Sequence, residues 1–90
     1  MKNTVCEVQV SNRLGLHARP AMMLVQEANR FASSISLRKD RTTVDCRSIL
    51  DLLTIAAPQG TTLQLIISGA DAEEAAAAIT GIFDNKFGEE

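Results

Sequence analysis

Four short segments of this chain alternate apolar and polar residues, and this pattern limits the possible folds more than any other feature. In the clearest segment, residues 61–68, the side chains of Leu63, Leu65 and Ile67 share one face. Residues 5–10, 34–38 and 42–46 alternate in a similar way. Each predicted strand has one apolar face, which is typical of a sheet that helices cover on one side only.

Between the predicted strands, and after the last one, apolar residues recur at the spacing of a helix. They predict helices over about 18–30 and over 49–54, and a last helix that begins near Asp71. Ser48 and Asp71 are expected to be the N-caps of the last two helices, with Leu52 and Ile55 facing the core. We expect residues 88–90 to be loose. The predicted order is β-α-β-β-α-β-α in an α+β fold, and periodicity alone leaves the strand order open.

Composition narrows the classes of function. Ninety residues, 46% of them hydrophobic and 22% charged, are expected to form one globular domain over 1–90. No apolar run could span or insert into a membrane, and the N-terminus lacks the apolar core of a signal peptide, so a cytoplasmic location is expected. A net charge of -2 and the lack of Trp and Tyr argue against nucleic-acid binding.

The two cysteines, Cys6 and Cys46, lie far apart in the sequence. There is no CxxC motif and no second histidine that could complete a metal site, so we expect neither a metal nor another cofactor. In a cytoplasmic protein two reduced thiols are the favoured interpretation, with a disulfide as the alternative.

The single histidine, His17, is predicted at or next to the N-cap of the first helix, with Pro20 in the first turn. A lone histidine is most often structural, but its neighbours favour a role in anion binding. A helix N-terminus offers unpaired amides, here those of Ala18 and Arg19, and the Arg19 guanidinium suits phosphate. We therefore interpret His17 as the carrier of a phosphoryl group.

The sequence shows no means of loading that histidine from a small molecule. It contains no nucleophile elbow for a Ser-His-Asp hydrolase, and no Gly-rich lysine loop for a nucleoside triphosphate. The protein is thus expected to hold a phosphoryl group that arrives from another protein and leaves to another protein.

The stretch Gly15-Leu16-His17-Ala18-Arg19-Pro20-Ala21 resembles the active-site signature of HPr, the histidine-containing phosphocarrier of the bacterial phosphoenolpyruvate-dependent phosphotransferase system. The resemblance extends over essentially the whole chain, including residues 48–53 and 56–60. It implies an open-faced sandwich, with an antiparallel sheet in the order 1-4-2-3 and three helices on one face.

The resemblance also implies a function. Enzyme I would pass a phosphoryl group from phosphoenolpyruvate to Nδ1 of His17, with Arg19 supporting it. Enzyme IIA would then receive it for sugar uptake. The protein would be a stoichiometric carrier and not an enzyme, and a monomer is expected.

Two further sites follow from the same resemblance. Ser48 matches the serine that an HPr kinase/phosphorylase modifies in some bacteria, and its alternative role is only that of an N-cap. The outward residues of the short helix match the docking surface of the family, namely Ile49, Leu50, Leu53 and Thr54. The alternative for the apolar members of this set is that they all belong to the core.

Three other interpretations stay open. Asn12 lies five residues before His17 and Leu14 three before it, while Asp51 stands where many sugar-system carriers have lysine. The spacing of Asn12 and His17 is also seen in NPr-like carriers, which serve a nitrogen- or potassium-linked branch, and Asp51 leaves the identity of the partner open. A second alternative is a regulatory module that works through Ser48 with His17 silent. A third is a small ligand- or RNA-binding domain of ferredoxin-like plan.

Overall fold

The computed structural model describes residues 2–89 and has the predicted order of strands and helices. The strands are β1 (Lys2–Gln9), β2 (Ser34–Lys39), β3 (Thr42–Asp45) and β4 (Thr62–Gly69). The helices are α1 (Ala18–Ala28), α2 (Ile49–Thr54) and α3 (Ala72–Asp84). A short 3-10 helix that was not predicted, η1 (Lys86–Gly88), follows α3.

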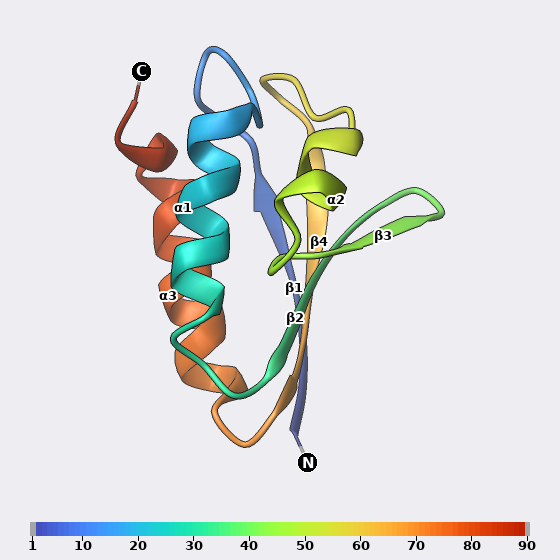
Figure 1. The fold of residues 1–90 in the computed structure, drawn as a ribbon, viewed down its shortest axis with the longest axis vertical. Coiled ribbons are helices and arrows are strands. Elements are labelled where there is room, and N and C mark those ends of the chain that lie inside the picture. Colours follow the sequence, from blue (N-terminus) through green and yellow to red (C-terminus); the bar gives the residue numbers. More distant parts are fainter. Residues whose placement is uncertain (1, 90) are drawn as a thin grey trace.

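The four strands form one antiparallel sheet in the order β1-β4-β2-β3. Val8 of β1 lies opposite Leu63 of β4, and Leu65 of β4 lies opposite Leu37 of β2, so the apolar alternation of each strand is in phase with that of its neighbour. Figure 1 shows α1 and α3 running side by side along the sheet. The fold class and the strand order that the resemblance implied are confirmed.

The core lies between the sheet and its helices. The residues predicted to face inward on β4 are buried, as are Leu52 and Ile55 at α2. The alternating residues Ile35 and Leu37 of β2 are buried too. Val25, Phe31, Ala76 and Ile82 are only partly buried and pack against the edge of the core. None of the helices within residues 2–89 is long and apolar enough to cross a membrane.

Ser48 and Asp71 precede their helices as predicted, but only Ser48 is a side-chain cap. Its Oγ accepts a hydrogen bond from the amide of Asp51 at 3.2 Å. The Asp71 carboxylate makes no capping bond, because it is turned toward the loop between α1 and β2. There it accepts from the amides of Ala32 and Ser33 at 2.8 and 2.9 Å, and from the Ser33 hydroxyl at 2.5 Å.

The Asp71 contacts form a clamp between two loops at one end of the molecule. The hydrogen bond from the Ser33 hydroxyl, and then that from the Ala32 amide, lower the pKa of the Asp71 carboxyl. Gly69 lies in the same clamp with φ of +150°, and a Cβ there would be 2.3 Å from the Ser33 Oγ. Only glycine fits this close approach without displacing a neighbour.

The expectation that the end of the chain is loose is wrong for Gly88 and Glu89, while Glu90 lies outside the described residues. Phe87 of η1 is buried and its ring packs edge-on against Phe83 of α3, with centroids 4.9 Å apart. The amide of Glu89 donates to the Lys86 carbonyl at 2.9 Å. The buried Phe87 ring therefore fixes the position of Glu89.

Both cysteines are free thiols. Burial, and then the adjacent Asp45 carboxylate, raise the pKa of Cys46 to about 12. Cys6 is half-buried, and its Sγ lies 3.9 Å from the hydroxyl of Thr80 on α3. The interpretation of reduced thiols is thus consistent with the structure.

Candidate functional site

The loop between β1 and α1 places His17 at the start of the helix. Gly15 in this loop has φ of +74°, and a Cβ there would lie 2.7 Å from the Ala57 carbonyl oxygen. The next residue, Leu16, donates its amide to that same carbonyl at 2.9 Å and is buried. The glycine allows the loop to pack tightly against the segment after α2, so the backbone that carries His17 is held firmly.

His17 is the N-cap residue of α1, as predicted. Its carbonyl accepts the Ala21 amide at 3.0 Å, and its side chain is 35% exposed, so one side of the ring is open to solvent. The amides of Ala18 and Arg19 donate to no acceptor within residues 2–89, and Pro20 has no amide hydrogen. Two free donors and the positive end of α1 therefore lie beside the imidazole.

A carboxylate lies on the other side of the ring. Nε2 of His17 is 3.1 Å from Oε1 and 3.2 Å from Oε2 of Glu89, whose side chain is only 12% exposed. Asn12 Nδ2 donates to the same Oε1 at 2.8 Å. The hydrogen bonds from His17 and Asn12, in that order, lower the pKa of Glu89, and the Arg19 charge adds a smaller effect.

Asn12 is fully buried and connects the loop to Glu89. Its Nδ2 also donates to the Gly15 carbonyl at 2.7 Å. Both neighbours of this nitrogen are acceptors, so the amide group cannot be reversed without losing both hydrogen bonds. The Asn12 Oδ1 has no hydrogen-bond partner within residues 2–89. The buried Asn12 amide therefore links the loop before α1 to Glu89 and orients both.

The contacts fix the chemistry of the ring. An ionised carboxylate can only accept, so the hydrogen between Glu89 and the imidazole resides on Nε2. In the neutral ring, Nδ1 then has the free electron pair. A nucleophilic nitrogen, two unpaired amides and the exposed Arg19 side chain are all at the start of α1. This arrangement suits an electrophile that carries negative oxygens.

The other predicted residues lie on α2 and at its N-cap, and α2 packs against α1. Leu50 is 74% exposed and Leu53 46% exposed, and Thr54 is also exposed, so the alternative that all the apolar residues are core is wrong for these two leucines. Ile49 is half-buried against the core. The half-buried Ser48 caps this helix and lies immediately before the exposed residues.

Sequence reasoning missed Met22 and Glu89. Met22 is an exposed apolar side chain of α1, which packs against α2, and Leu14 before α1 is exposed as well. For Met22 a signal was available, because it lies outside the helical stripe of Ala21, Leu24 and Ala28. Glu89 had no local signal, since its contact with His17 depends on how Phe87 packs.

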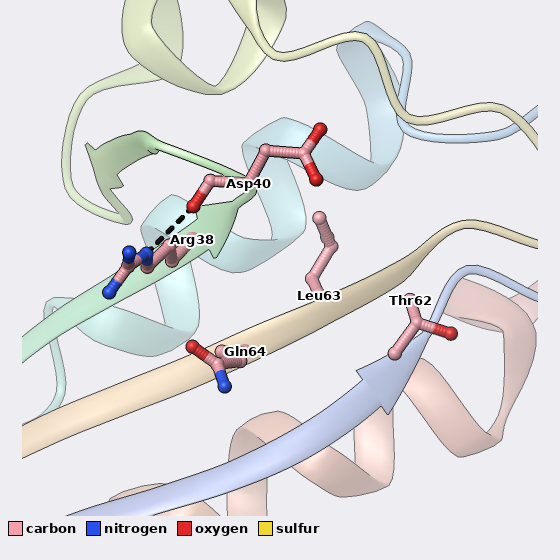
Figure 2. A pocket seen from close by; sticks show the side chains of 5 residues that line it. All are labelled: Arg38, Asp40, Thr62, Leu63 and Gln64. Carbon is pink, nitrogen blue, oxygen red and sulfur yellow. Dashed lines mark hydrogen bonds between the residues drawn. The ribbon is translucent and has the colours of Figure 1, made fainter.

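Two pockets in the part of the chain that the structure describes are lined by other residues. The larger, about 380 Å³, lies where the turn between β2 and β3 meets the start of β4, and its lining is mainly polar (Figure 2): Arg38, Asp40, Thr62, Leu63 and Gln64. A second, of about 270 Å³, is lined by Lys39, Asp40, Thr42, Thr54, Ile55 and Ala56. His17 is part of neither, and its open side is a protein surface that a partner could cover.

Comparison with known proteins identifies the family. A family model described as "PTS HPr component phosphorylation site" matches residues 5–85. The phosphocarrier protein HPr of Treponema pallidum is 46% identical over 83 residues, which is 92% of this chain and 94% of the relative. The HPr-like protein Crh of Halalkalibacterium halodurans is 41% identical over 80 residues, 89% and 95% of the two chains. The crystal structure of HPr from Thermoanaerobacter tengcongensis matches with a TM-score of 0.88 and 39% identity, over 100% of this chain and 99% of the other.

Proposed function

The chain belongs to the HPr family of phosphocarriers of the phosphotransferase system, and from that premise we propose that it accepts a phosphoryl group on His17 from enzyme I and delivers it to an enzyme IIA domain. The observation that carries the proposal is the contact between Nε2 of His17 and Glu89, at 3.1 and 3.2 Å, which leaves Nδ1 as the free nucleophile. The protein would act in the cytoplasm as a stoichiometric intermediate and would have no catalytic turnover of its own.

In the proposed transfer, Nδ1 of His17 attacks the phosphorus atom of the donor. The new N–P bond forms as the bond from phosphorus to the donor breaks, and that electron pair stays with the donor. The amides of Ala18 and Arg19 and the Arg19 guanidinium would receive the phosphoryl oxygens. Transfer to enzyme IIA reverses these steps with a new nucleophile.

The docking surface for both partners is proposed to be the exposed apolar residues of α1 and α2. Leu50 and Leu53, the residues that the resemblance implied, are joined by Met22, which is 44% exposed. Thr54 and the half-buried Ile49 lie on the same short helix. An exposed apolar patch next to a reactive group is typical of a surface that partners cover transiently.

Incubation with phosphoenolpyruvate and enzyme I, followed by mass spectrometry of the intact chain, tests this proposal. We expect one acid-labile phosphate on His17 that is absent in His17→Ala and retained in Ser48→Ala. Arg19→Ala should accept phosphate more slowly while remaining folded, and Arg41→Ala, an exposed arginine in the turn between β2 and β3, provides the control. No acid-labile product with any purified enzyme I would contradict the phosphocarrier function.

A second function is supported by the relatives named Crh and by the position of Ser48. Its hydroxyl is the N-cap of α2, where a phosphate is electrostatically favoured and would add negative charge beside Leu50. The regulatory proposal predicts an acid-stable phosphate with ATP and an HPr kinase/phosphorylase, lost in Ser48→Ala. If the kinase modifies no residue, Ser48 is only a cap.

We propose that exposed residues of the docking surface decide whether the carrier serves a sugar branch or a nitrogen-linked branch. Leu14 is 69% exposed, and Asp51 is exposed in the first turn of α2, so both can influence which partner docks. Transfer rates from the enzyme I of a sugar system and from that of a nitrogen-linked system would separate the two branches. The monomer we propose is checked by light scattering.

A further inference from the structure

Glu89 contacts the ring nitrogen that the proposed transfer does not use. Both of its oxygens lie within 3.2 Å of Nε2 of His17, and Asn12 holds Oε1 from the buried side at 2.8 Å. The carboxylate is thus anchored at a fixed place rather than carried on a free side chain, because Phe87 fixes the backbone before it. Attachment of a group to Nδ1 leaves Nε2 free to keep this contact, since the two nitrogens lie on opposite sides of the ring.

The proton on Nε2 decides how readily a phosphoryl group leaves Nδ1. With that proton present, breaking the N–P bond returns the electron pair to Nδ1 and releases a neutral imidazole. Without it, the same step must release an imidazolate anion, a much poorer leaving group. The N–P bond is labile in the protonated phosphoimidazolium and inert in the deprotonated ring, so the group beside Nε2 influences the transfer.

Building on the proposed function, we propose that Glu89 is a positioning residue that keeps the proton on Nε2 of phosphorylated His17 and thereby keeps the phosphoryl group transferable. The phosphoimidazolium ring is cationic, and an adjacent carboxylate stabilises that charge. Asn12 supports this role by orienting the carboxylate toward the ring.

Within residues 2–89 few charges surround this carboxylate. The side chains that lower the pKa of Glu89 are the His17 imidazole, then the neutral Asn12 amide, and then the Arg19 guanidinium of α1. Lys86 of η1 and Arg13 of the preceding loop are exposed, and neither has a hydrogen bond or ion pair with Glu89 within residues 2–89. The effect of Glu89 on the ring is therefore separable by substitution at one position.

The test is the pH profile of hydrolysis of the phosphorylated protein. The chain is phosphorylated with phosphoenolpyruvate and enzyme I, freed of enzyme I, and followed by mass spectrometry as phosphate is lost at a series of pH values. In Glu89→Gln, which keeps the size and removes the charge, we expect the midpoint of the profile to move to lower pH by roughly 0.5 to 1 unit. Glu74→Gln, at an exposed position in the first turn of α3, should leave it unchanged.

A second measurement does not depend on phosphorylation. The ring nitrogens of His17, observed by ¹⁵N NMR near neutral pH, should show the proton on Nε2, and Glu89→Leu should raise the share of the form with the proton on Nδ1. An unchanged hydrolysis midpoint in Glu89→Gln, or an unchanged ring in Glu89→Leu, would overturn the role of Glu89. Failure to phosphorylate His17 at all would instead overturn the proposed function. The NMR result would still show whether Glu89 holds the proton on Nε2 of His17.

Discussion

Two carboxylates close loops at opposite ends of the molecule, and their partners differ in kind. Glu89 contacts His17 at the start of α1, and Asp71 contacts the loop that follows α1. In Figure 1 the end of α1 and the start of α3 lie at the bottom. Asp71 accepts from two backbone amides and a hydroxyl, which keep their protons throughout the physiological range. Glu89 accepts from the Asn12 carboxamide and the His17 imidazole, and the imidazole is the group whose covalent state changes in the transfer that we propose.

The difference separates stability from function. At the Asp71 end every partner is permanent, so the contacts form a fixed clamp between the α1–β2 loop and the start of α3. At the Glu89 end one partner is a reactive ring, so the contacts can influence chemistry. The comparison predicts that substitutions at the Asp71 end reduce the free energy of unfolding and leave phosphoryl transfer intact. Substitutions at the Glu89 end should slow phosphoryl transfer, whether or not they also reduce stability.

The largest effect on stability is expected for Gly69→Ala. The new Cβ would lie 2.3 Å from the Ser33 Oγ and 2.7 Å from its Cα, at a backbone φ of +150° that alanine rarely adopts. We expect a loss of about 3 kcal/mol in the free energy of unfolding, measured by urea denaturation. Phosphoryl acceptance by the folded fraction should be unchanged. Impaired transfer in that fraction would show that the two ends are not independent.

A smaller loss is expected for Asp71→Asn. Because hydrogen bonding lowers the folded-state pKa of Asp71, its stabilising contribution is complete above the unfolded pKa of about 3.9 and disappears as the pH falls through the lowered folded value. The parent should therefore be more stable than the variant at pH 7, and the gap should close in strong acid. A gap that is independent of pH would mean that the carboxylate charge is not what the clamp uses.

Asn12→Ala should cost about 1 to 2 kcal/mol, because the Gly15 carbonyl and the Glu89 carboxylate each lose a donor. Unlike the two changes above, it should also slow the acceptance of phosphate, since the carboxylate loses its anchor. Stopped-flow or quenched transfer from enzyme I measures this rate. A variant that is destabilised but transfers at the parent rate would assign Asn12 to structure alone.

The smallest effect on stability is expected for Leu50→Asp, within about 0.5 kcal/mol, because the side chain is 74% exposed. Its affinity for enzyme I should nevertheless fall about tenfold, since a charge would enter the apolar patch. Val5→Asp offers a control for binding, because Val5 is 62% exposed on a distant strand. Equal loss of affinity in both variants would remove Leu50 from the docking surface.

Local pattern predicted most of the fold. The alternation of apolar and polar residues within β2 and within β4 is enough to predict each strand, because it gives the strand one apolar face. Both strands lie within a residue or two of the predicted bounds. His17 was predicted at the helix start because the first turn of a helix accommodates a proline, here Pro20. The order of the strands came from the resemblance, since loop lengths and periodicity do not determine it.

Tertiary contacts account for what was missed. Asp71 has the residue type and position of an N-cap, but two amides and a hydroxyl from a loop 38 and 39 residues away compete for its carboxylate. Glu89 looks like part of a solvated tail, and only the burial of Phe87 brings it to His17. Neither outcome is encoded within a short window of sequence.

The raised pKa of Cys46 has a practical consequence for labelling. Cys46 is buried and its thiol pKa is about 12, so the thiol stays protonated and unreactive near neutral pH. Cys6 is the more accessible thiol, beside Thr80 on α3. A maleimide dye or spin label would therefore attach at Cys6 on β1, away from His17 and the exposed leucines. The native chain thus has its own reporter position for following partner binding, without an engineered cysteine.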